Sequence, residues 1–388
     1  MDERWTDDDR AAMRAALDAA ERGRGFTSPN PLVGAVVVAE GEIVATGFHE
    51  RWGAAHAEVV ALDAAGARAR GATLYVTLEP CCVWGKTPPC TEAILRAGIA
   101  RVVAPVEDPN PEVAGRGFGA LEAAGLDVRV GLMRDEAVAL NAPYFKWRRT
   151  RLPHVLLKLA VSLDGRIASA PGGDRWISSA ASRSVGHEMR AVSDAVMIGI
   201  GTVLADDPRL TDRRNVAGAR QPARIVVDSS LRIPLDASLV TDGAAPTIVA
   251  CRDDAGPLRQ DALEDHGLRV WRLPSREGRI ELTPLLRRTA AEGFLSVLCE
   301  GGRQLATSLL REELVDEVAF FVAPRIVGEG GPTAVGDLGP RWLGGRVSLE
   351  DVRWTPVGTD RLLRARVARS RDGASAPRRG GVECSRAS

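Results

Sequence analysis

Residues that can bind zinc and move a proton lie together in the first quarter of the chain. His56 and Glu58 form the string His-Ala-Glu, and Cys81 and Cys90 each follow a proline. Zinc binds thiolate sulfur and imidazole nitrogen, and a site with three protein ligands keeps a fourth position for water. Zinc lowers the pKa of that water to about 7, and a nearby carboxylate can pass its proton to a leaving amine. We therefore predict His56, Cys81 and Cys90 as zinc ligands and Glu58 as the proton shuttle.

The order of these residues favours one kind of chemistry. An H-x-E string followed by Pro-Cys and a second cysteine is the signature of zinc deaminases. Here eight residues separate Cys81 from Cys90, whereas nucleic-acid deaminases have two, so the longer loop can reach over a substrate. Lys86 is the only charged residue of this loop and suits a phosphate. We also expect the start of a helix at Cys90 to lower the pKa of its thiol.

Two other interpretations of the cysteines are considered. Cys82 would convert the site into a closed structural one if it were a fourth ligand, because structural zinc sites normally have four protein ligands. A cluster of buried cysteines without metal is the second alternative. Both leave Glu58 without a purpose, so we predict that Cys82 is a packed free thiol.

The elements that must position these residues alternate between helix and strand. Helical spacing of Met13, Ala16, Leu17 and Ala20 predicts a first helix over residues 8–22. Further helices are predicted at 56–65, 91–97 and 118–124. Strands are predicted at 33–38, 43–48, 73–78, 101–106 and 128–130. This alternation is typical of an α/β layered domain.

A basic and aromatic stretch at 145–153 is interpreted as a linker to a second α/β domain. In that domain we predict helices at 180–191, 284–292 and 303–310. Strands are predicted at 155–159, 195–199, 224–228, 247–250, 296–300 and 317–322, with a final hairpin of 346–354 and 361–368. The predicted division is 1–146, 147–369 and a disordered tail at 370–388, which has no apolar periodicity.

Composition excludes several classes of protein. The chain has 388 residues, 45% hydrophobic and 26% charged, and no run approaches the roughly 20 apolar residues of a membrane helix. Its polar, acidic start does not resemble a signal peptide. Residues 1–146 carry 15 basic and 21 acidic side chains, which argues against a nucleic-acid surface. Six cysteines form no disulfide framework, so we expect a cytoplasmic enzyme.

Several strings of the chain, taken together, resemble one enzyme family. They are Ser28-Pro29-Asn30-Pro31-Leu32-Val33-Gly34, His56-Ala57-Glu58-Val59, Thr77-Leu78-Glu79-Pro80-Cys81, Gly85-Lys86-Thr87-Pro88-Pro89-Cys90 and Asp108-Pro109-Asn110-Pro111. In this order they closely resemble the bifunctional deaminase–reductases of riboflavin biosynthesis, over residues 10–368. The resemblance implies a cytidine-deaminase-like three-layer N-terminal domain and a C-terminal domain similar to dihydrofolate reductase.

For the N-terminal half, the resemblance implies removal of the 2-amino group from a diaminopyrimidinone ribosylamino phosphate. It also implies that Asn30, His49 and Lys86 contact this substrate. After Pro80-Cys81 the family usually has Ser-His, whereas Cys82-Val83 stands here, so one substrate contact is missing. The zinc ligands and Glu58 match the family.

For the C-terminal half, the strings 158–165, 176–178, 201–208 and 300–302 are similar to the reductase of the same family. The resemblance implies that NADPH reduces the ribosyl group to a ribityl group. The implied cofactor contacts are Lys158, Ala160, Trp176, Thr202, Asp206, Ser229, Gly302, Arg303, Gln304, Leu305, Ala306, Thr307 and Ser308. The implied substrate contacts are Asp174, Arg190, Leu210, Arg213 and Glu300.

The chemistry of these side chains fits the implied roles. Arg190 and Arg213 suit a phosphate, because guanidinium groups bind it bidentately, and Glu300 can accept hydrogen bonds from sugar hydroxyls. Asp174 stands where relatives usually carry serine, so its charge could repel the phosphate. Without the resemblance, each arginine would be interpreted as a surface ion pair and each glycine-rich turn as a tight turn.

Four hypotheses for function follow. The first is a bifunctional enzyme that acts on small phosphorylated pyrimidines with Zn²⁺ and NADPH, without nucleic acid or membrane partners; a homo-oligomer is left open. The second keeps only the reductase, with a deaminase half altered in substrate or efficiency. The third makes the N-terminal half a non-catalytic zinc module. The fourth, a nucleic-acid deaminase, is disfavoured by the acidic balance and the loop length.

Overall fold

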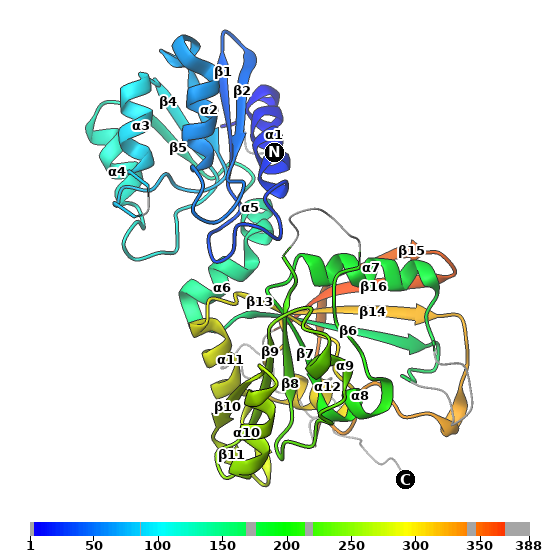
Figure 1. The fold of residues 1–388 in the computed structure, drawn as a ribbon. Helices are drawn as coiled ribbons and strands as arrows, with labels where there is room; N and C mark the ends of the chain where they lie inside the picture. The colour runs from blue at the N-terminus through cyan, green and yellow to red at the C-terminus, as the bar shows by residue number, and fades with distance from the viewer. Residues whose placement is uncertain (1–3, 86, 168–175, 214–219, 340–346, 369–388) are drawn as a thin grey trace, which may run out of the picture.

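The chain folds into two α/β domains, which lie on either side of helices α5 and α6 (Figure 1). The structure is a computed structural model and describes residues 4–85, 87–167, 176–213, 220–339 and 347–368. Lys86, Asp174 and the predicted tail at 370–388 lie outside the described residues. Of the described helices, none combines the length and the apolar character that a membrane crossing requires.

The N-terminal domain has a five-stranded sheet of order β2-β1-β3-β4-β5. β1 pairs antiparallel with β2 and β3, whereas β3, β4 and β5 are parallel. The strands are β1 (Gly34–Ala39), β2 (Glu42–Phe48), β3 (Thr73–Val76), β4 (Arg101–Ala104) and β5 (Asp127–Val130). The helices are α1 (Asp7–Glu21), α2 (Ala57–Ala65), η1 (Gly66–Ala69), α3 (Cys90–Ala97), α4 (Arg116–Ala123), α5 (Arg134–Leu140) and α6 (Ala142–Thr150).

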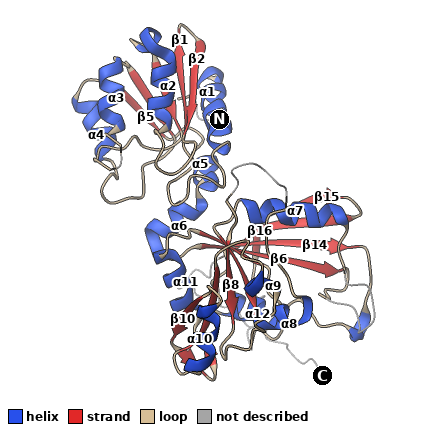
Figure 2. Cartoon of the chain, viewed as in Figure 1, coloured by secondary structure: helices blue, strands red, loops and turns tan. Residues whose placement is uncertain are grey.

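Both faces of this sheet are covered, which confirms the predicted three layers. Along β1, Ala35 and Val37 pack against α2, whereas Val36 faces the opposite side with α1. Along β3, Leu74 faces the side covered by α2 and Tyr75 faces the side covered by α1. Successive residues of a strand point to opposite faces, so these continuous apolar runs indicate strands buried on both sides. Figure 2 shows the helices on the two sides of the strands.

Close packing fixes the helix that carries the predicted shuttle. A Cβ atom on Gly47 of β2 would lie 2.5 Å from the carbonyl oxygen of Ala57 and 2.5 Å from the backbone nitrogen of Ala61. The absence of a side chain at this position therefore lets α2 approach the sheet. As a result, His56 and Glu58 lie at the start of α2, beside the end of β3.

The predicted linker is mostly helical. Residues 142–150 form α6, and its Tyr144 and Phe145 are buried in the core of the N-terminal domain. Lys146 of the same helix forms an ion pair with Asp316 of the C-terminal domain. Among the basic residues of this stretch, Arg149 is exposed, whereas Arg148 is half-buried and stacks over Tyr144 and Trp147. The connection between the domains is thus packed against both.

The C-terminal domain has a nine-stranded sheet of order β10-β9-β8-β7-β13-β6-β14-β16-β15. Neighbouring strands from β10 to β14 in this order are parallel. At the edge of the sheet, β16 pairs antiparallel with β14, and β15 pairs antiparallel with β16. The strands are β6 (His154–Ser162), β7 (Ala195–Gly199), β8 (Ala223–Val227), β9 (Thr247–Arg252), β10 (Arg269–Leu273), β13 (Ser296–Cys299), β14 (Glu317–Ala323), β15 (Leu349–Val357) and β16 (Asp360–Val367). A separate hairpin consists of β11 (Ser275–Arg276) and β12 (Arg279–Ile280).

Helices cover both faces of this second sheet. α11 and α12 pack on one face and α7, α8, α9 and α10 on the other. Their bounds are α7 (Ala180–Ala191), α8 (Ile200–Asp206), α9 (Ser238–Thr241), α10 (Pro257–Asp265), α11 (Leu282–Ala291), α12 (Arg303–Arg311) and η2 (Gly328–Gly330). Among the described elements of this domain, the sequence analysis missed α8, α9, α10, η2, β10 and the β11–β12 hairpin.

Candidate active sites

The three predicted zinc ligands converge between α2, α3 and the end of β3. Nδ1 of His56 lies 3.1 Å from Sγ of Cys90 and 3.5 Å from Sγ of Cys81. All three ligand atoms lie within 4.8 Å of one another. Zn–S bonds of about 2.3 Å and Zn–N bonds of about 2.0 Å place tetrahedral ligands at comparable separations. Among the described residues, this group contains no fourth side chain, and Cys82 is outside it.

The expectation that the helix start would favour the thiolate of Cys90 was wrong. Cys90 does begin α3, but its backbone N–H donates to Sγ of Cys81, 3.4 Å away. A hydrogen bond from Cys90, opposed by burial and reinforced by His56, lowers the pKa of Cys81 to about 4. The same hydrogen bond, together with burial, raises the pKa of Cys90. The start of α3 therefore stabilises the thiolate of Cys81 and not that of Cys90.

Glu58 is buried in the first turn of α2, with 4% of its surface exposed. Burial, and then the negative charge of Cys81, raise the pKa of Glu58 to about 7. A carboxyl group with a pKa near neutrality can both accept and release a proton. Its place beside the three metal-binding side chains agrees with the predicted shuttle position.

His49 and Asn30, two predicted substrate contacts, lie side by side next to this cluster. Nδ2 of Asn30 is 3.1 Å from Nε2 of His49, and Nδ1 of His49 is 3.0 Å from the carbonyl oxygen of Ala55. A carbonyl can only accept, so Nδ1 carries the proton and Nε2 accepts from the amide. Burial lowers the pKa of His49, which keeps this ring neutral. Its ring centroid lies 5.6 Å from that of His56.

One contributor to the cluster was missed. Oγ1 of Thr87 lies 3.3 Å from Nε2 of His56, the ring nitrogen that does not face the cysteines. A partner on the second nitrogen fixes the orientation and tautomer of a metal-binding histidine. Thr87 belongs to the Gly-Lys-Thr-Pro-Pro-Cys string, but its type alone gave no reason to select it.

The C-terminal domain contains a cavity of about 1940 Å³ over the ends of its parallel strands. A single small ligand usually occupies about 300–1,000 Å³, so this cavity has room for a cofactor beside a substrate. Fifteen of the residues predicted by resemblance line it. They are Lys158, Ala160, Trp176, Arg190, Thr202, Asp206, Leu210, Arg213, Ser229, Glu300, Gly302, Arg303, Gln304, Leu305 and Ser308. Ala306 and Thr307 are buried within α12 and are not among the lining residues.

Glu300 and Arg190 bind each other on the wall of this cavity. Nε and Nη2 of Arg190 donate to the two carboxylate oxygens of Glu300 at 2.5 and 3.0 Å, and Lys158 Nζ donates at 3.3 Å. Burial alone would raise the pKa of Glu300, but the charges of Lys158 and Arg190 lower it to about 2. Arg190 thus has Glu300 as its partner, whereas Arg213 is exposed at the cavity.

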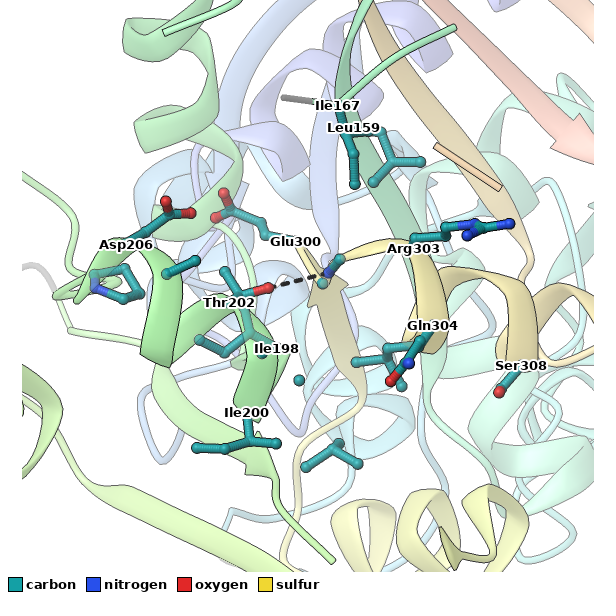
Figure 3. A pocket seen from close by; sticks show the side chains of 18 of the residues that line it. Leu159, Ile167, Ile198, Ile200, Thr202, Asp206, Glu300, Arg303, Gln304 and Ser308 are labelled. Atoms are coloured by element: carbon teal, nitrogen blue, oxygen red, sulfur yellow. Dashed lines mark hydrogen bonds between the residues drawn. The ribbon is translucent and has the colours of Figure 1, made fainter. Parts of the chain in front are cut away.

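The start of α12 meets the start of α8 across the cavity (Figure 3). The backbone N–H of Gly302 donates to Oγ1 of Thr202 at 3.2 Å. A Cβ atom on Gly302 would lie 3.2 Å from the same oxygen, so glycine allows this approach. Arg303, Gln304 and Ser308 follow on α12 along one wall of the cavity in Figure 3.

Two further parts of the cavity wall were missed. His187 lines it, with Nδ1 3.1 Å from the carbonyl oxygen of Thr211, and the β11–β12 hairpin contributes Arg276 and Arg279. His187 lies one helical turn before Arg190, so helical spacing in α7 could have identified it. The hairpin is remote in sequence from every recognised string.

Family comparisons match both domains. Residues 6–105 match the model of the cytidine and deoxycytidylate deaminase zinc-binding region. Residues 153–363, more than half of the chain, match the model of the RibD C-terminal domain.

Similar whole proteins carry both parts in one chain. Riboflavin biosynthesis protein RibD of Aquifex aeolicus is 41% identical over 92% of this chain and 97% of its own length. RibD of Escherichia coli is 43% identical over 81% of this chain and 88% of its own. The solved structure of Acinetobacter baumannii RibD is 37% identical, with a TM-score of 0.83 over 93% of this chain and 99% of that chain.

A structure from Thermotoga maritima is described as a diaminohydroxyphosphoribosylaminopyrimidine deaminase/5-amino-6-(5-phosphoribosylamino)uracil reductase. It is 33% identical, with a TM-score of 0.81 over 92% of this chain and 98% of that chain. These likenesses extend over both domains and confirm the predicted fold of each.

Proposed function

Because the chain belongs to the RibD family of bifunctional deaminase–reductases of riboflavin biosynthesis, we propose how its own residues divide the two reactions. In the N-terminal domain, His56, Cys81 and Cys90 hold zinc and Glu58 moves the proton. The substrate is the diaminopyrimidinone ribosylamino phosphate, which loses its 2-amino group. The observation that carries this assignment is the convergence of the three ligand atoms beside a buried carboxyl group.

The donor set supports zinc as the bound metal. Two thiol sulfurs and one imidazole nitrogen are the ligands that zinc prefers, and three protein ligands are typical of a catalytic site. When bound, zinc supplies an acidified water as the nucleophile. Glu58 takes a proton from this water and delivers it to the leaving amine. Its carboxyl group is shielded from bulk water.

His49 and Asn30 position the heterocycle in this proposal. The Asn30–His49 hydrogen bond and the His49–Ala55 contact hold both side chains in one orientation. The amide of Asn30 keeps its oxygen and its second N–H for the heterocycle, and the neutral imidazole holds it without adding charge near the reacting carbon. Lys86 is proposed to bind the substrate phosphate, as the sequence analysis expects.

In the C-terminal domain we propose that NADPH occupies the cavity along α12 and α8. The Gly301-Gly302 turn before the nine-residue α12 supports this, because the N–H groups at a helix start favour phosphate. When bound, NADPH supplies the hydride that reduces the ribosyl group. Arg213 offers its guanidinium to the substrate phosphate, and Arg190 holds Glu300 ionised toward the sugar hydroxyls.

The remaining predictions belong to the same proposal. A cytoplasmic location is part of this proposal, as the cysteine content of the chain led us to expect. Small phosphorylated pyrimidines are the proposed partners. Self-association into a homo-oligomer stays a prediction.

Separate assays of the two steps test this proposal. The purified chain is incubated with the diaminopyrimidinone phosphate without NADPH, and ammonia is measured; the deaminated uracil compound is then supplied with NADPH. We expect ammonia release in the first assay and NADPH oxidation in the second. Removal of metal by a chelator should abolish only the first. NADPH oxidation without any ammonia release would contradict the bifunctional assignment and favour the reductase-only alternative.

A further inference from the structure

A buried carboxylate lies two residues before the zinc ligand Cys81 and is bound entirely by backbone groups of a distant segment. Glu79 has 3% of its surface exposed. Its Oε2 accepts hydrogen bonds from the backbone N–H groups of Asp108 and Gly115, both at 3.0 Å. Its Oε1 accepts from those of Gly117 at 2.8 Å and Phe118 at 3.3 Å. Four donors thus converge on one side chain.

These hydrogen bonds join the metal-binding loop to the start of α4. The four donors lie 29 to 39 residues further along the chain, two between β4 and α4 and two in the first turn of α4. A Cβ atom on Gly117 would lie 2.1 Å from the carbonyl oxygen of Pro80, so α4 can approach only because this residue is glycine. The segment between Glu79 and Cys81 is therefore in direct contact with α4.

Backbone hydrogen bonds hold the loop that carries Cys81 on two sides. On one side Glu79 donates its own backbone N–H to the carbonyl oxygen of Val106 at 3.2 Å. On the other side the N–H of Thr91 in α3 donates to the carbonyl oxygen of Cys81 at 3.2 Å. The position of Sγ of Cys81 thus depends on a short loop whose first residue is anchored by its side chain.

We propose that Glu79 is a positioning residue of the zinc site, which holds Cys81 at ligand distance by binding the backbone of residues 108–118. The carboxylate contacts no metal and no substrate in this role. Its two oxygens match four N–H donors, and a charged acceptor makes these hydrogen bonds stronger than neutral ones. Groups that orient a metal ligand typically change metal affinity 10- to 100-fold when they are mutated.

Glu79→Gln is the direct test, because the amide keeps the shape of the side chain but has only one acceptor oxygen. In either amide orientation its NH₂ group faces two backbone donors, so two hydrogen bonds are lost. The readout is zinc release from the full-length protein to a chromophoric chelator, measured well below the melting temperature. We expect release at least about tenfold faster than from the wild type. NADPH oxidation by the same chain should be unchanged.

A matched control separates positioning from simple loss of stability. Asp9→Asn alters another buried carboxylate of the same domain, which binds Tyr75, Arg101 and Thr6 on the α1 side of the sheet, opposite to α2 and α3. We expect this variant to melt at a lower temperature and to release zinc at the wild-type rate. Gly117→Ala leaves Glu79 intact but forces α4 away from Pro80, and we expect faster zinc release from it as well.

The outcomes distinguish this inference from the proposed function on which it rests. Wild-type protein without bound zinc would contradict the proposed zinc site itself. Wild-type protein that binds zinc, with release from Glu79→Gln at the same rate, would overturn only the positioning role. Equally fast release from Asp9→Asn would overturn it too, because general destabilisation would then explain the effect.

Discussion

The Glu58→Gln variant is expected to lose ammonia release by about 1,000-fold while it keeps its zinc, because general acid–base groups contribute about 10²- to 10⁴-fold. Glutamine preserves the volume of the buried side chain but cannot accept a proton. The steady-state rate of ammonia release and the zinc content of the same preparation are the measurements. The expected loss is in kcat, since Glu58 acts on protons and not on substrate affinity.

The second activity of the chain serves as the control for this variant. NADPH oxidation on the deaminated substrate should equal that of the wild type, because Glu58 lies in the other domain. Ammonia release within tenfold of the wild type, with zinc bound, would exclude Glu58 as the proton shuttle. Loss of zinc would instead assign Glu58 a role in metal binding.

Glu300→Gln is expected to have the largest effect on the reductase. The substitution removes the negative charge between Arg190 and Lys158 and the acceptor proposed for the sugar hydroxyls. Hydrogen bonds to charged groups contribute about 1.5–3 kcal/mol, so we expect kcat/KM for NADPH oxidation to fall about 100-fold. Ammonia release should stay at the wild-type rate, and an equal loss of both activities would contradict this assignment.

The contribution of Glu300 to the free energy of unfolding is predicted to depend on pH. The pKa of Glu300 is lowered to about 2 in the folded protein, from an ordinary value of 4.5. Its ionised form therefore stabilises the fold above pH 4.5, and this contribution is lost as the pH falls toward 2. Unfolding in denaturant at pH 7 should show a free energy of unfolding about 3 kcal/mol lower for Glu300→Gln. The difference should shrink as the pH is lowered through this window; a difference that stays constant would contradict it.

The sequence was sufficient for the parts of the fold that repeat strong local patterns. The helix predicted at 180–191 coincides with α7, and the continuous apolar runs of β1 and β7 were recognised as strands. The linker prediction at 145–153 was less successful, because a run of Lys, Arg and Trp indicates an exposed segment. Tyr144 and Phe145 bury against the sheet, a tertiary contact that local periodicity does not reveal.

The metal cluster was predictable because residue type alone restricts it. Few side chains bind zinc, so His56, Cys81 and Cys90 could be grouped without knowledge of their distances. Which thiolate the helix start would favour could not be predicted. The answer depends on the direction of the backbone N–H of Cys90, which donates to Sγ of Cys81.

Contacts between residues far apart in sequence were beyond the sequence analysis. Arg190 and Glu300 were both selected as substrate contacts, but they are 110 residues apart and their pairing appears only in the folded chain. Glu79 was part of a recognised string and received no role, because its four partners are backbone groups with no sequence signature.

The coordination of zinc in the purified full-length protein is the most direct test of the account. X-ray absorption at the zinc edge counts sulfur and nitrogen ligands without a crystal. We predict one zinc per chain with two sulfurs from Cys81 and Cys90, one imidazole nitrogen from His56, and no third sulfur. A third sulfur ligand, which Cys82 would supply, or a chain that binds no zinc would contradict the account.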